Sequence, residues 1–506
     1  MGIIQNQGSK SSFYILLGFG IGAINMLILF PMYFSPEEIG LTRAILDTSL
    51  TFSSLCTIGA IPIINKFNPF YKHHLNPKQN DLPFLTLLII LIGYSLLLSI
   101  GLYNKEFILR KLGKSPKLAD YFKYIYPSTL LILIFTWLEA FSWSIKKAVI
   151  SNFLKETVVR VITTLLVILY GLGYLNFHLF IILFCLIYII PVISLFIVMI
   201  QSGEWSVNFI SISRVTKKLK GRMFSFSIYL FAGQFFNVLA RTNDTFLIVG
   251  LRGLTETGIF TIAIYLATII EIPQRSLISI CTPILSESWK NKDLQNIKNI
   301  YYKSVSNLML ISCFLFGLIF INIHNLISFL QFISHSKDIS YEPLALLFLI
   351  LGISELFDLS TGINGILIGT SNFWKFDFFT NLTFIITSLP LNYFLIKHFG
   401  LNGLAFSNFA TILIFNSIRY FFILHKFKFQ PYNIKHLKFI SSIFILLFLI
   451  NSLPYLGNFI YDGTIKIFIY LLAFYFIVLK LNPAPELTNM FFDFLEKRNI
   501  KILKRF

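Results

Sequence analysis

Apolar stretches, each about as long as a membrane-spanning helix, follow one another along the whole sequence. A helix needs roughly 20 mostly apolar residues to cross the hydrocarbon core of a bilayer, so fourteen helices would use about 280 residues. Of the 506 residues, 56% are hydrophobic and only 13% are charged, whereas soluble domains carry about 25% charged residues. This composition excludes a soluble globular protein and a disordered chain. The sequence therefore predicts an all-α integral membrane protein with about fourteen spanning helices.

The segments between the predicted spans are short and carry most of the basic residues, within a net charge of +19. The segments on the side of the N-terminus hold the larger share of Lys and Arg. Because cytoplasmic loops are enriched in these residues, both termini are predicted to be cytoplasmic. The predicted outer loop 104–123 departs from this rule with six basic residues. Either a neighbouring span is misplaced or the loop contacts an anionic partner; we favour an ordinary loop. The predicted spans are 12–33, 44–65, 84–103, 124–145, 150–173, 177–200, 223–250, 258–284, 304–329, 343–369, 375–397, 401–424, 437–455 and 459–480.

The two halves of the sequence resemble each other. Ser151–Lys155 recurs as Ser371–Lys375 at an offset of 220 residues, and Glu139 matches Asp358 at an offset of 219. Two further matches at nearly the same offset join Glu38 to Glu256 and Pro62 to Pro283. The repeat unit has six spans, an even number, so both copies cross the membrane in the same direction, as in transporters built from parallel repeats. The predicted domains are an N-terminal six-helix lobe (1–202), a C-terminal six-helix lobe (203–424), and two additional helices with a tail (425–506).

Four pairs of opposite charges lie one helical turn apart within the predicted spans or at their edges. At this spacing the two side chains share a helix face and can neutralise each other. One interpretation is structural, because pairing is how buried charge is normally tolerated. The other is functional, because charges inside a membrane often line a hydrated pathway. The pairs are Arg43 with Asp47, Glu156 with Arg160, Arg241 with Asp244, and Glu271 with Arg275.

The arginines of these pairs are candidates for binding a diphosphate headgroup. A guanidinium presents a planar fork of donors and stays charged at any working pH. Arg160 and Arg241 are the first candidates, because they lie well inside spans of opposite halves. Arg43 and Arg275 come second, since Arg43 lies near the predicted outer edge of its span.

Three carboxylates, Glu139, Glu355 and Asp358, have no basic residue one helical turn away. Glu355 and Asp358 share a helix face and repel each other, which favours the uptake of a proton or a cation. The alternative is a polar helix contact inside a packed lobe. With Asp244 added, the candidates for ion coupling are Glu139, Asp358, Glu355 and Asp244. No metal site and no cofactor are predicted.

Several short motifs resemble those of one transporter family. The segment 243–250 (NDTFLIVG), followed by 254–263 (LTETGIFTIA), resembles the seventh-to-eighth helix signature of polysaccharide flippases, with Phe260 where the family usually has Tyr. The segment 36–44 (PEEIGLTRA) fits the same scheme, and 399–405 (FGLNGLA) resembles the family's turn between helices eleven and twelve. In length, helix number and repeat, the whole chain is similar to the oligosaccharide-lipid (O-antigen and exopolysaccharide) flippase branch of the multidrug/oligosaccharidyl-lipid/polysaccharide exporter superfamily.

The resemblance implies a multi-pass protein of the bacterial inner membrane that flips a polyprenyl-diphosphate-linked oligosaccharide by alternating access, in the synthesis of a surface polysaccharide such as O-antigen. It implies no covalent chemistry, so the chain is not expected to be an enzyme. The implied partners are the lipid-linked oligosaccharide and membrane lipid, with a polysaccharide polymerase and a chain-length regulator as further candidates and no nucleic acid. Two alternatives stay open: a cation-coupled multidrug exporter of the same superfamily and, less favoured, a membrane polysaccharide polymerase or glycosyltransferase.

Overall fold

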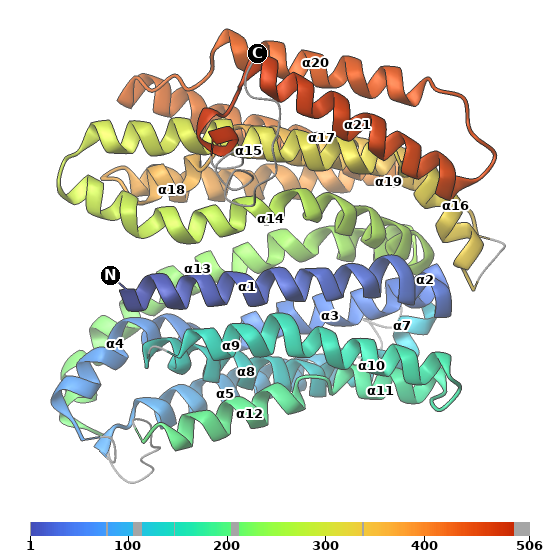
Figure 1. The fold of residues 1–506 in the computed structure, drawn as a ribbon. Coiled ribbons are helices and arrows are strands. Elements are labelled where there is room, and N and C mark those ends of the chain that lie inside the picture. The colour runs from blue at the N-terminus through green and yellow to red at the C-terminus, as the bar shows by residue number, and fades with distance from the viewer. Residues whose placement is uncertain are drawn as a thin grey trace. The chain divides into compact units, whose positions relative to one another are not determined.

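The structure of the chain is a computed structural model that describes residues 2–76, 79–104, 114–145, 147–203, 212–335 and 339–489. All regular secondary structure in these ranges is helical (Figure 1), which confirms the predicted all-α fold. The helices form two compact units, Met1–Gly258 with Ser334–Ser336 (unit 1) and Ile259–Ile333 with Lys337–Phe506 (unit 2). The predicted domain boundaries at 202 and 424 stay predictions.

Unit 1 contains a series of long helices joined by short turns. Two π-helical stretches, η1 (Asn25–Leu29) and η4 (Leu154–Val158), each continue directly from one α-helix into the next. The remaining elements of this unit are α1 (Gly2–Ile24), α2 (Phe30–Tyr33), α3 (Pro36–Cys56), α4 (Ala60–His74), α5 (Leu82–Tyr103), α7 (Pro116–Tyr121), η3 (Phe122–Tyr124), α8 (Ile125–Ser144), α9 (Ala148–Phe153), α10 (Val159–Gly171), α11 (Phe177–Cys185), α12 (Ile189–Gln201) and α13 (Arg214–Leu251).

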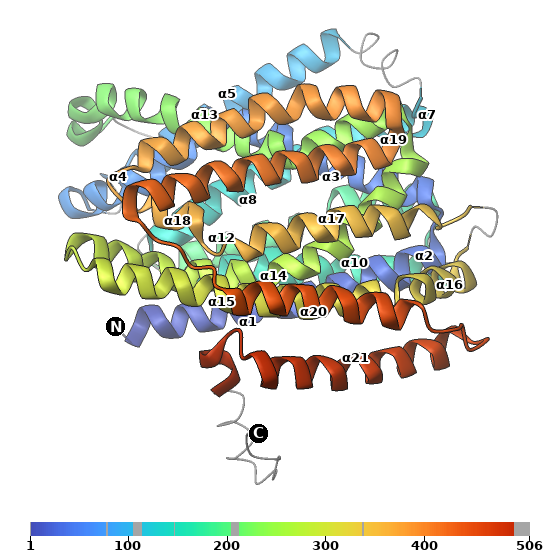
Figure 2. The same ribbon diagram turned by 90° about the horizontal axis from the view of Figure 1, so that it is seen from above.

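Unit 2 contains the remaining helices, apart from the first turn of α14. The last two, α20 and α21, run side by side (Figure 2) and pack against α15 and α16 within this unit. The helices are α14 (Leu254–Lys290), α15 (Leu294–Phe320), α16 (Ile323–Ile333), α17 (Pro343–Ser360), α18 (Asn364–Gly369), α19 (Trp374–Phe427), α20 (Ile434–Asn451) and α21 (Phe459–Leu481).

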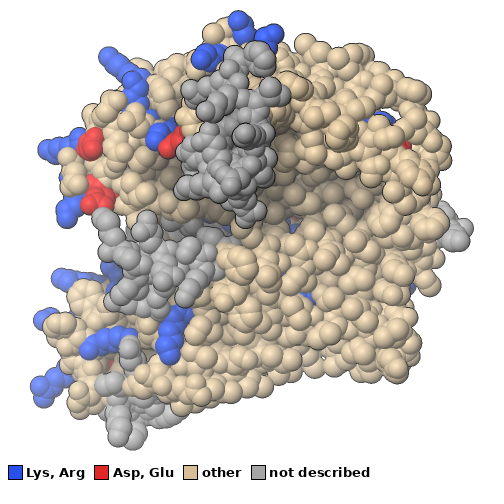
Figure 3. All heavy atoms as spheres, in the orientation of Figure 1, with Lys and Arg blue, Asp and Glu red and all other residues tan. Residues whose placement is uncertain are grey.

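Most of these helices are built to cross a membrane. Among the described residues, eleven are long and apolar enough to do so, or up to twelve if the pair α3 and α4, bent by 52°, forms one span. Figure 3 shows Lys and Arg gathered at one end of the helices on the face drawn, with few charges along their length. This separation is expected when the middle of each helix lies in hydrocarbon, so the chain is a multi-pass membrane protein.

One predicted span differs from the helices that form near the N-terminus. The predicted span 44–65 is wrong as a single helix, because α3 begins at Pro36 and the chain bends between Cys56 and Ala60. A capping box starts α3 early: Ser35 Oγ accepts from the Glu38 amide at 3.3 Å, and Glu38 Oε2 accepts from the Ser35 amide at 2.9 Å. Arg43 therefore lies inside a helix rather than in an outer segment.

Three other expectations can be compared with the helices. The predicted span 343–369 is broken, because α17 ends at Ser360 and α18 begins at Asn364. Conversely, α19 runs on through both predicted spans 375–397 and 401–424, but Gly400 has φ 62° and ψ −146° and separates two helical parts. Most of the predicted loop 104–123 lies outside the described residues; its end forms α7. The count of fourteen spans stays a prediction.

Local hydrogen bonds repeat at the offset seen in the sequence. Ser142 Oγ donates to the carbonyl of Glu139 at 2.8 Å, and Thr361 Oγ1 donates to that of Asp358 at 2.7 Å. Ser151 and Ser371 likewise each donate to the carbonyl three residues before them. In both halves a carboxylate thus lies one turn before a helix break, as duplication of one ancestral unit would give.

Helix α8 occupies the centre of unit 1, packed against α3, α4 and α12. Its Trp137, Leu138 and Phe141 are buried in an apolar cluster. The Trp137 indole donates to Thr86 Oγ1 of α5 at 3.0 Å. Glu139 lies on the same helix and is 5% exposed, so its charge needs protein partners.

The first turns of α3 and α14 approach each other through two glycines. A Cβ added to Gly40 would lie 2.0 Å from the carbonyl oxygen of Leu254, and one added to Gly258 would lie 1.9 Å from that of Pro36. The contacts are reciprocal because Pro36 and Gly40 match Leu254 and Gly258 at one offset, 218 residues. Both obstacles are backbone atoms, which cannot rotate away.

Gly40→Ala is therefore expected to destabilise the protein by about 1–3 kcal/mol, the usual effect of overpacking, because the two helix starts must separate. Thermal unfolding of the purified protein in detergent measures the change. Gly20→Ala is the matched control, since nothing lies within 4 Å of a Cβ at that position of α1 and Ala favours a helix over Gly. Equal melting temperatures for the two variants would contradict this account.

Candidate functional site

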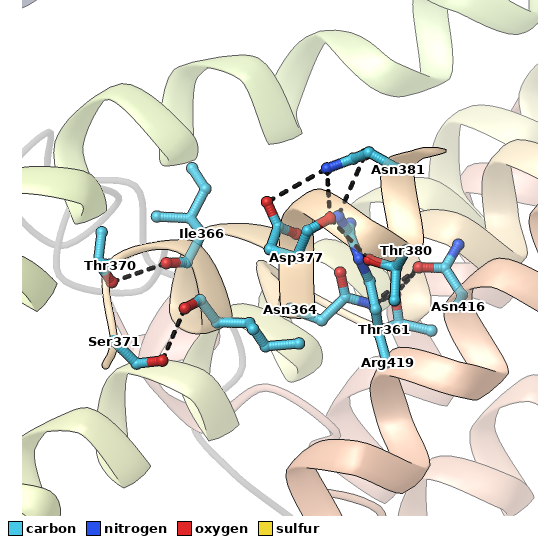
Figure 4. Close-up of polar contacts among 11 residues, drawn as sticks. Thr361, Asn364, Ile366, Thr370, Ser371, Asp377, Thr380, Asn381, Asn416 and Arg419 are labelled. Carbon is cyan, nitrogen blue, oxygen red and sulfur yellow. Dashed lines mark hydrogen bonds and ion pairs between the residues drawn. The ribbon is translucent and has the colours of Figure 1, made fainter. Parts of the chain in front are cut away.

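A polar cluster surrounds the break between α17 and α18 in unit 2. Thr361 Oγ1 donates to Asn416 Oδ1 of α19 at 3.1 Å, and Asn364 Nδ2 donates to the same oxygen at 2.7 Å (Figure 4). These three side chains are nearly fully buried. Polar groups at a helix break inside a membrane are characteristic of transporters, where unwound segments line binding sites.

Asp358 joins this cluster from the last turn of α17. Its Oδ1 accepts from Asn416 Nδ2 at 2.6 Å, and its Oδ2 accepts from Gln274 Nε2 of α14 at 3.2 Å. Gln274 also donates to the carbonyl of Gly362 at 3.3 Å, within the break itself. Among the described residues no Lys or Arg forms an ion pair with Asp358: neutral amides make its hydrogen bonds, and Arg419 interacts with it electrostatically without direct contact.

A second part of the same cluster is an ion pair within α19. The Arg419 guanidinium pairs with Asp377 and lies against the ring of Phe415, 4.0 Å from its centroid. Arg419 Nη2 also donates to Asn381 Oδ1 at 3.4 Å, and Asn381 in turn donates to Asp377 (Figure 4). Arg419 Nε is buried without a hydrogen-bond partner in the described structure. These charges therefore stabilise one another across the kinked helix.

Glu355 lies one turn before Asp358 and close to the pair formed by Glu271 and Arg275, whose ion pair measures 2.7 Å. Glu355 interacts electrostatically with Glu271, Asp358 and Arg275. Glu355 of α17 is thus within electrostatic reach of two other carboxylates and one arginine. The structure brings together Glu355, Asp358 and Arg275, all of them candidates from the sequence.

The corresponding carboxylate of unit 1 has a different environment. Glu139 pairs with Lys155 Nζ at 3.2 Å, across from α8 to η4. Lys375, which matches Lys155 in the repeat, is exposed and lies near the ring of Trp374 instead. The two halves therefore neutralise their matching carboxylates differently: Glu139 has a cation in contact and Asp358 has none.

Arg160 completes the polar group of unit 1. Its Nη2 pairs with Glu156 at 3.2 Å, and its guanidinium lies 4.7 Å from the ring centroid of Phe19 in α1. Arg160, Glu156, Lys155 and Glu139 all interact electrostatically with one residue, Tyr188. Within the described residues Arg160 Nη1 is buried and makes no hydrogen bond. A buried donor without an acceptor is costly, so this nitrogen has capacity for an anionic ligand.

The other two predicted pairs in unit 1 are those of Arg43 and Arg241. Arg43 Nε pairs with Asp47 Oδ2 at 2.7 Å, and that oxygen also accepts from Thr245 Oγ1 of α13 at 2.5 Å. Arg241 is exposed and Asp244 is partly buried. The pairs of Arg43, Arg160 and Arg275 that spacing predicts therefore form ion pairs, and Asp47 also joins α3 to α13.

Sequence spacing did not indicate the contacts made between different helices or between the two parts of α19. The partners that spacing missed are Lys155 for Glu139, Gln274 and Asn416 for Asp358, and Arg419 with Asp377. Their separations along the chain range from 16 to 84 residues. The repeat offers one signal, since it places Glu139 and Asp358 at matching positions. No group of three or more His, Cys, Asp or Glu side chains suited to a metal ion occurs among the described residues.

The chain matches known proteins both in sequence and in fold. Residues 144–331 match the family model described as "Polysaccharide biosynthesis protein". The lipid II flippase MurJ in an inward closed conformation superposes with a TM-score of 0.70 at 15% identity, covering 93% of this chain and 97% of that one. No curated protein matches the sequence.

Multidrug transporters share the fold as well. An inward-facing MATE family transporter of the MOP superfamily superposes with a TM-score of 0.64 at 12% identity, covering 82% of this chain and 94% of that one. A MATE transporter of Vibrio cholerae gives a TM-score of 0.54 at 13% identity, covering 85% and 98%. These matches confirm the resemblance expected from the sequence. The chain has the fold that MurJ and the MATE transporters share, and its residues 144–331 match the polysaccharide biosynthesis family model.

Proposed function

We propose that the protein is a flippase for polyprenyl-diphosphate-linked oligosaccharide in the bacterial inner membrane, acting in the synthesis of a surface polysaccharide. The observation that carries this proposal is the match of residues 144–331 to a polysaccharide biosynthesis family, because it favours polysaccharide synthesis over drug export among proteins with this fold. A flippase moves its lipid between leaflets and makes no covalent bond. Both termini would be cytoplasmic, as the distribution of Lys and Arg favours.

Export in a deletion strain tests this function directly. Loss of the gene should leave lipid-linked repeat units on the inner leaflet, while the matching surface polysaccharide disappears. Restoration by the intact gene is the control. Normal surface polysaccharide in the deletion strain, without accumulated lipid-linked units, would exclude the proposal. The same strain permits a search for a polysaccharide polymerase and a chain-length regulator as partners.

The substrate diphosphate needs cationic donors inside the membrane, and Arg160 has the best local geometry for this role. One of its terminal nitrogens is paired with Glu156 and the other is buried without an acceptor. A phosphate oxygen would supply the missing acceptor, and a charge-assisted hydrogen bond is stronger than a neutral one. Arg241, Arg43 and Arg275 are the further candidates for this role.

Arg160→Gln is expected to reduce export of the lipid-linked substrate on the order of tenfold, the effect of losing one charged hydrogen bond. Arg160→Lys should recover only part of the activity, because an ammonium keeps the charge but not the planar fork. Surface polysaccharide at matched protein levels is the measurement. Arg252→Gln, which removes an exposed ion pair with Glu256, is the control and should export normally. Full export by Arg160→Gln would remove Arg160 from the substrate site.

A cation-coupled multidrug exporter is the second candidate, favoured by the shared fold of the MATE transporters. Its cavity should prefer cationic drugs and depend on carboxylates more than on arginines. Charge reversal at Arg160 and Arg241 separates the two: a flippase loses polysaccharide export, whereas a drug exporter keeps it and changes drug efflux. A polysaccharide polymerase or glycosyltransferase is disfavoured, since the solved structures that resemble this chain include a flippase and multidrug transporters.

A further inference from the structure

An apolar groove of about 440 Å³ lies in unit 1 between α5 and α13, closed at one end by the bend between α3 and α4. Its walls are Ile58 at the bend, Leu85 and Leu88 of α5, and Phe224 and Ile228 of α13. Phe224 is 68% exposed and Ile228 is 50% exposed. Large apolar side chains at this exposure contact lipid chains in a membrane protein.

The polar groups of this groove are satisfied, with one exception. Thr86 Oγ1, Thr216 Oγ1 and Ser227 Oγ each have hydrogen-bond partners in the protein. Of the side chains that the structure describes, Lys220 is the only charged one that lines the groove. Within the described residues its ammonium makes no hydrogen bond or ion pair. The groove therefore offers one cation, at one end of an apolar wall.

The distances along α13 match one leaflet of a bilayer. Lys220 and Phe231 both line the groove and lie eleven residues apart, or roughly 16 Å at 1.5 Å per residue. Half of a hydrocarbon core of about 30 Å is about 15 Å. When Phe231 lies near the bilayer centre, Lys220 reaches the level of the lipid headgroups.

The surroundings of Lys220 are strongly basic. The first turns of α13 carry Arg214, Lys217, Lys218 and Arg222 in addition to Lys220. Lys66 of α4 lies nearby, with its ammonium 3.6 Å from the ring centroid of Phe226. Such clusters next to a membrane attract anionic lipids of the cytoplasmic leaflet.

One carboxylate lies close to this end of the groove but is already engaged. Asp81 Oδ2 accepts from the Ser213 amide and from Thr216 Oγ1, both at 2.8 Å. These two bonds fix the start of α13, and Asp81 sets one negative charge against the five basic residues of the first turns of α13. The charge of the site is therefore net positive.

We propose that this groove binds an anionic phospholipid of the bilayer, with one acyl chain between α5 and α13 and its phosphate at Lys220. The groove is one leaflet long, which suits an acyl chain better than a long polyprenyl tail. The proposal does not depend on the transported substrate, so it can hold even if the proposed function fails.

Native mass spectrometry of the purified full chain, incubated with phosphatidylglycerol or phosphatidylcholine, tests the site. The wild type should retain more phosphatidylglycerol, and Lys220→Gln should lower this retention about fivefold, the effect of one basic residue at a membrane surface. Lys220→Arg should restore it. Lys218→Gln is the matched control, because Lys218 is exposed in the same basic segment but does not line the groove. Equal losses for both glutamine variants would show general surface attraction and overturn the site.

Filling the groove tests the acyl-chain contact separately. Leu88→Trp should lower retention of both lipids, whereas Ile100→Trp, farther along α5 at an exposed position outside the groove, should not. Unchanged lipid binding by Leu88→Trp would overturn the proposed chain position. A polyprenyl phosphate that displaces phosphatidylglycerol in the wild type, but not in Leu88→Trp, would assign the groove to the transported lipid instead. Elution of each variant as a folded species on size-exclusion chromatography accompanies these measurements.

Discussion

Asp358→Asn is expected to reduce transport of the lipid-linked substrate by roughly tenfold or more, in the usual range for energetic coupling between two sites. Asp358 is held by the amides of Asn416 and Gln274, with no cation in contact within the described structure. Such a carboxylate can take up a proton or a small cation without first breaking an ion pair. The variant keeps the shape of the side chain but removes the exchangeable charge. Export of surface polysaccharide at equal protein level, measured over a range of pH, is the test.

The repeat supplies a control for this result. Glu139 occupies the matching position in the first half but pairs with Lys155, so Glu139→Gln should reduce transport less than Asp358→Asn and leave its pH dependence nearer to that of the wild type. Asp358→Glu should retain part of the activity. If Asp358→Asn transports at the wild-type rate with the wild-type pH dependence, Asp358 has no role in ion coupling. The predicted loss of transport depends on the proposed function. The position of Asp358 at a helix break is a feature of the structure and does not depend on that function.

The sequence predicted the helices well wherever one apolar stretch forms one helix. Composition and stretch length were sufficient for the all-α membrane fold, and one-turn spacing identified the ion pairs of Arg43, Arg160 and Arg275. These features are local, because both partners lie on the same helix. The repeat was also visible in the sequence, and the structure repeats its local hydrogen bonds at Ser142 and Thr361.

Helix ends and contacts between helices were beyond sequence reasoning. The early start of α3 depends on the capping box of Ser35 and Glu38, which the hydropathy pattern does not reveal. The break at Thr361 interrupts an apolar stretch that reads as continuous. Glu139 lacks a basic neighbour on its own helix and finds one on another, since packing brings Lys155 to it. Periodicity describes one helix at a time and therefore cannot supply such pairs.

A buried carboxylate near the end of the chain, Asp462, joins α21 to α16. Asp462 is fully buried and pairs with Lys466 Nζ at 2.8 Å, one turn farther along α21. Asp462 Oδ2 also accepts from Asn325 Nδ2 of α16 at 2.7 Å, and its Oδ1 accepts from the Leu456 amide at 3.3 Å. Three polar groups, the Lys466 ammonium, the Asn325 amide and the Leu456 backbone amide, thus depend on one carboxylate. Both helices belong to unit 2, so this contact fixes the last helix to its own unit.

Asp462→Ala is expected to destabilise the protein by about 3 kcal/mol or more, because it leaves the Lys466 ammonium buried without a partner. Thermal unfolding in detergent measures the loss. The melting temperature of Asp462→Asn should lie between those of the wild type and Asp462→Ala, because the variant keeps an acceptor for Asn325. The matched control is Glu256→Ala, which removes the more exposed ion pair with Arg252 and should cost about 0.5 kcal/mol or less. If Asp462→Ala unfolds at the temperature of the wild type, Lys466 reaches water or headgroups once its partner is gone, and the pair contributes nothing to the attachment of α21. A large loss confined to Asp462→Ala instead makes this carboxylate the anchor of the last helix.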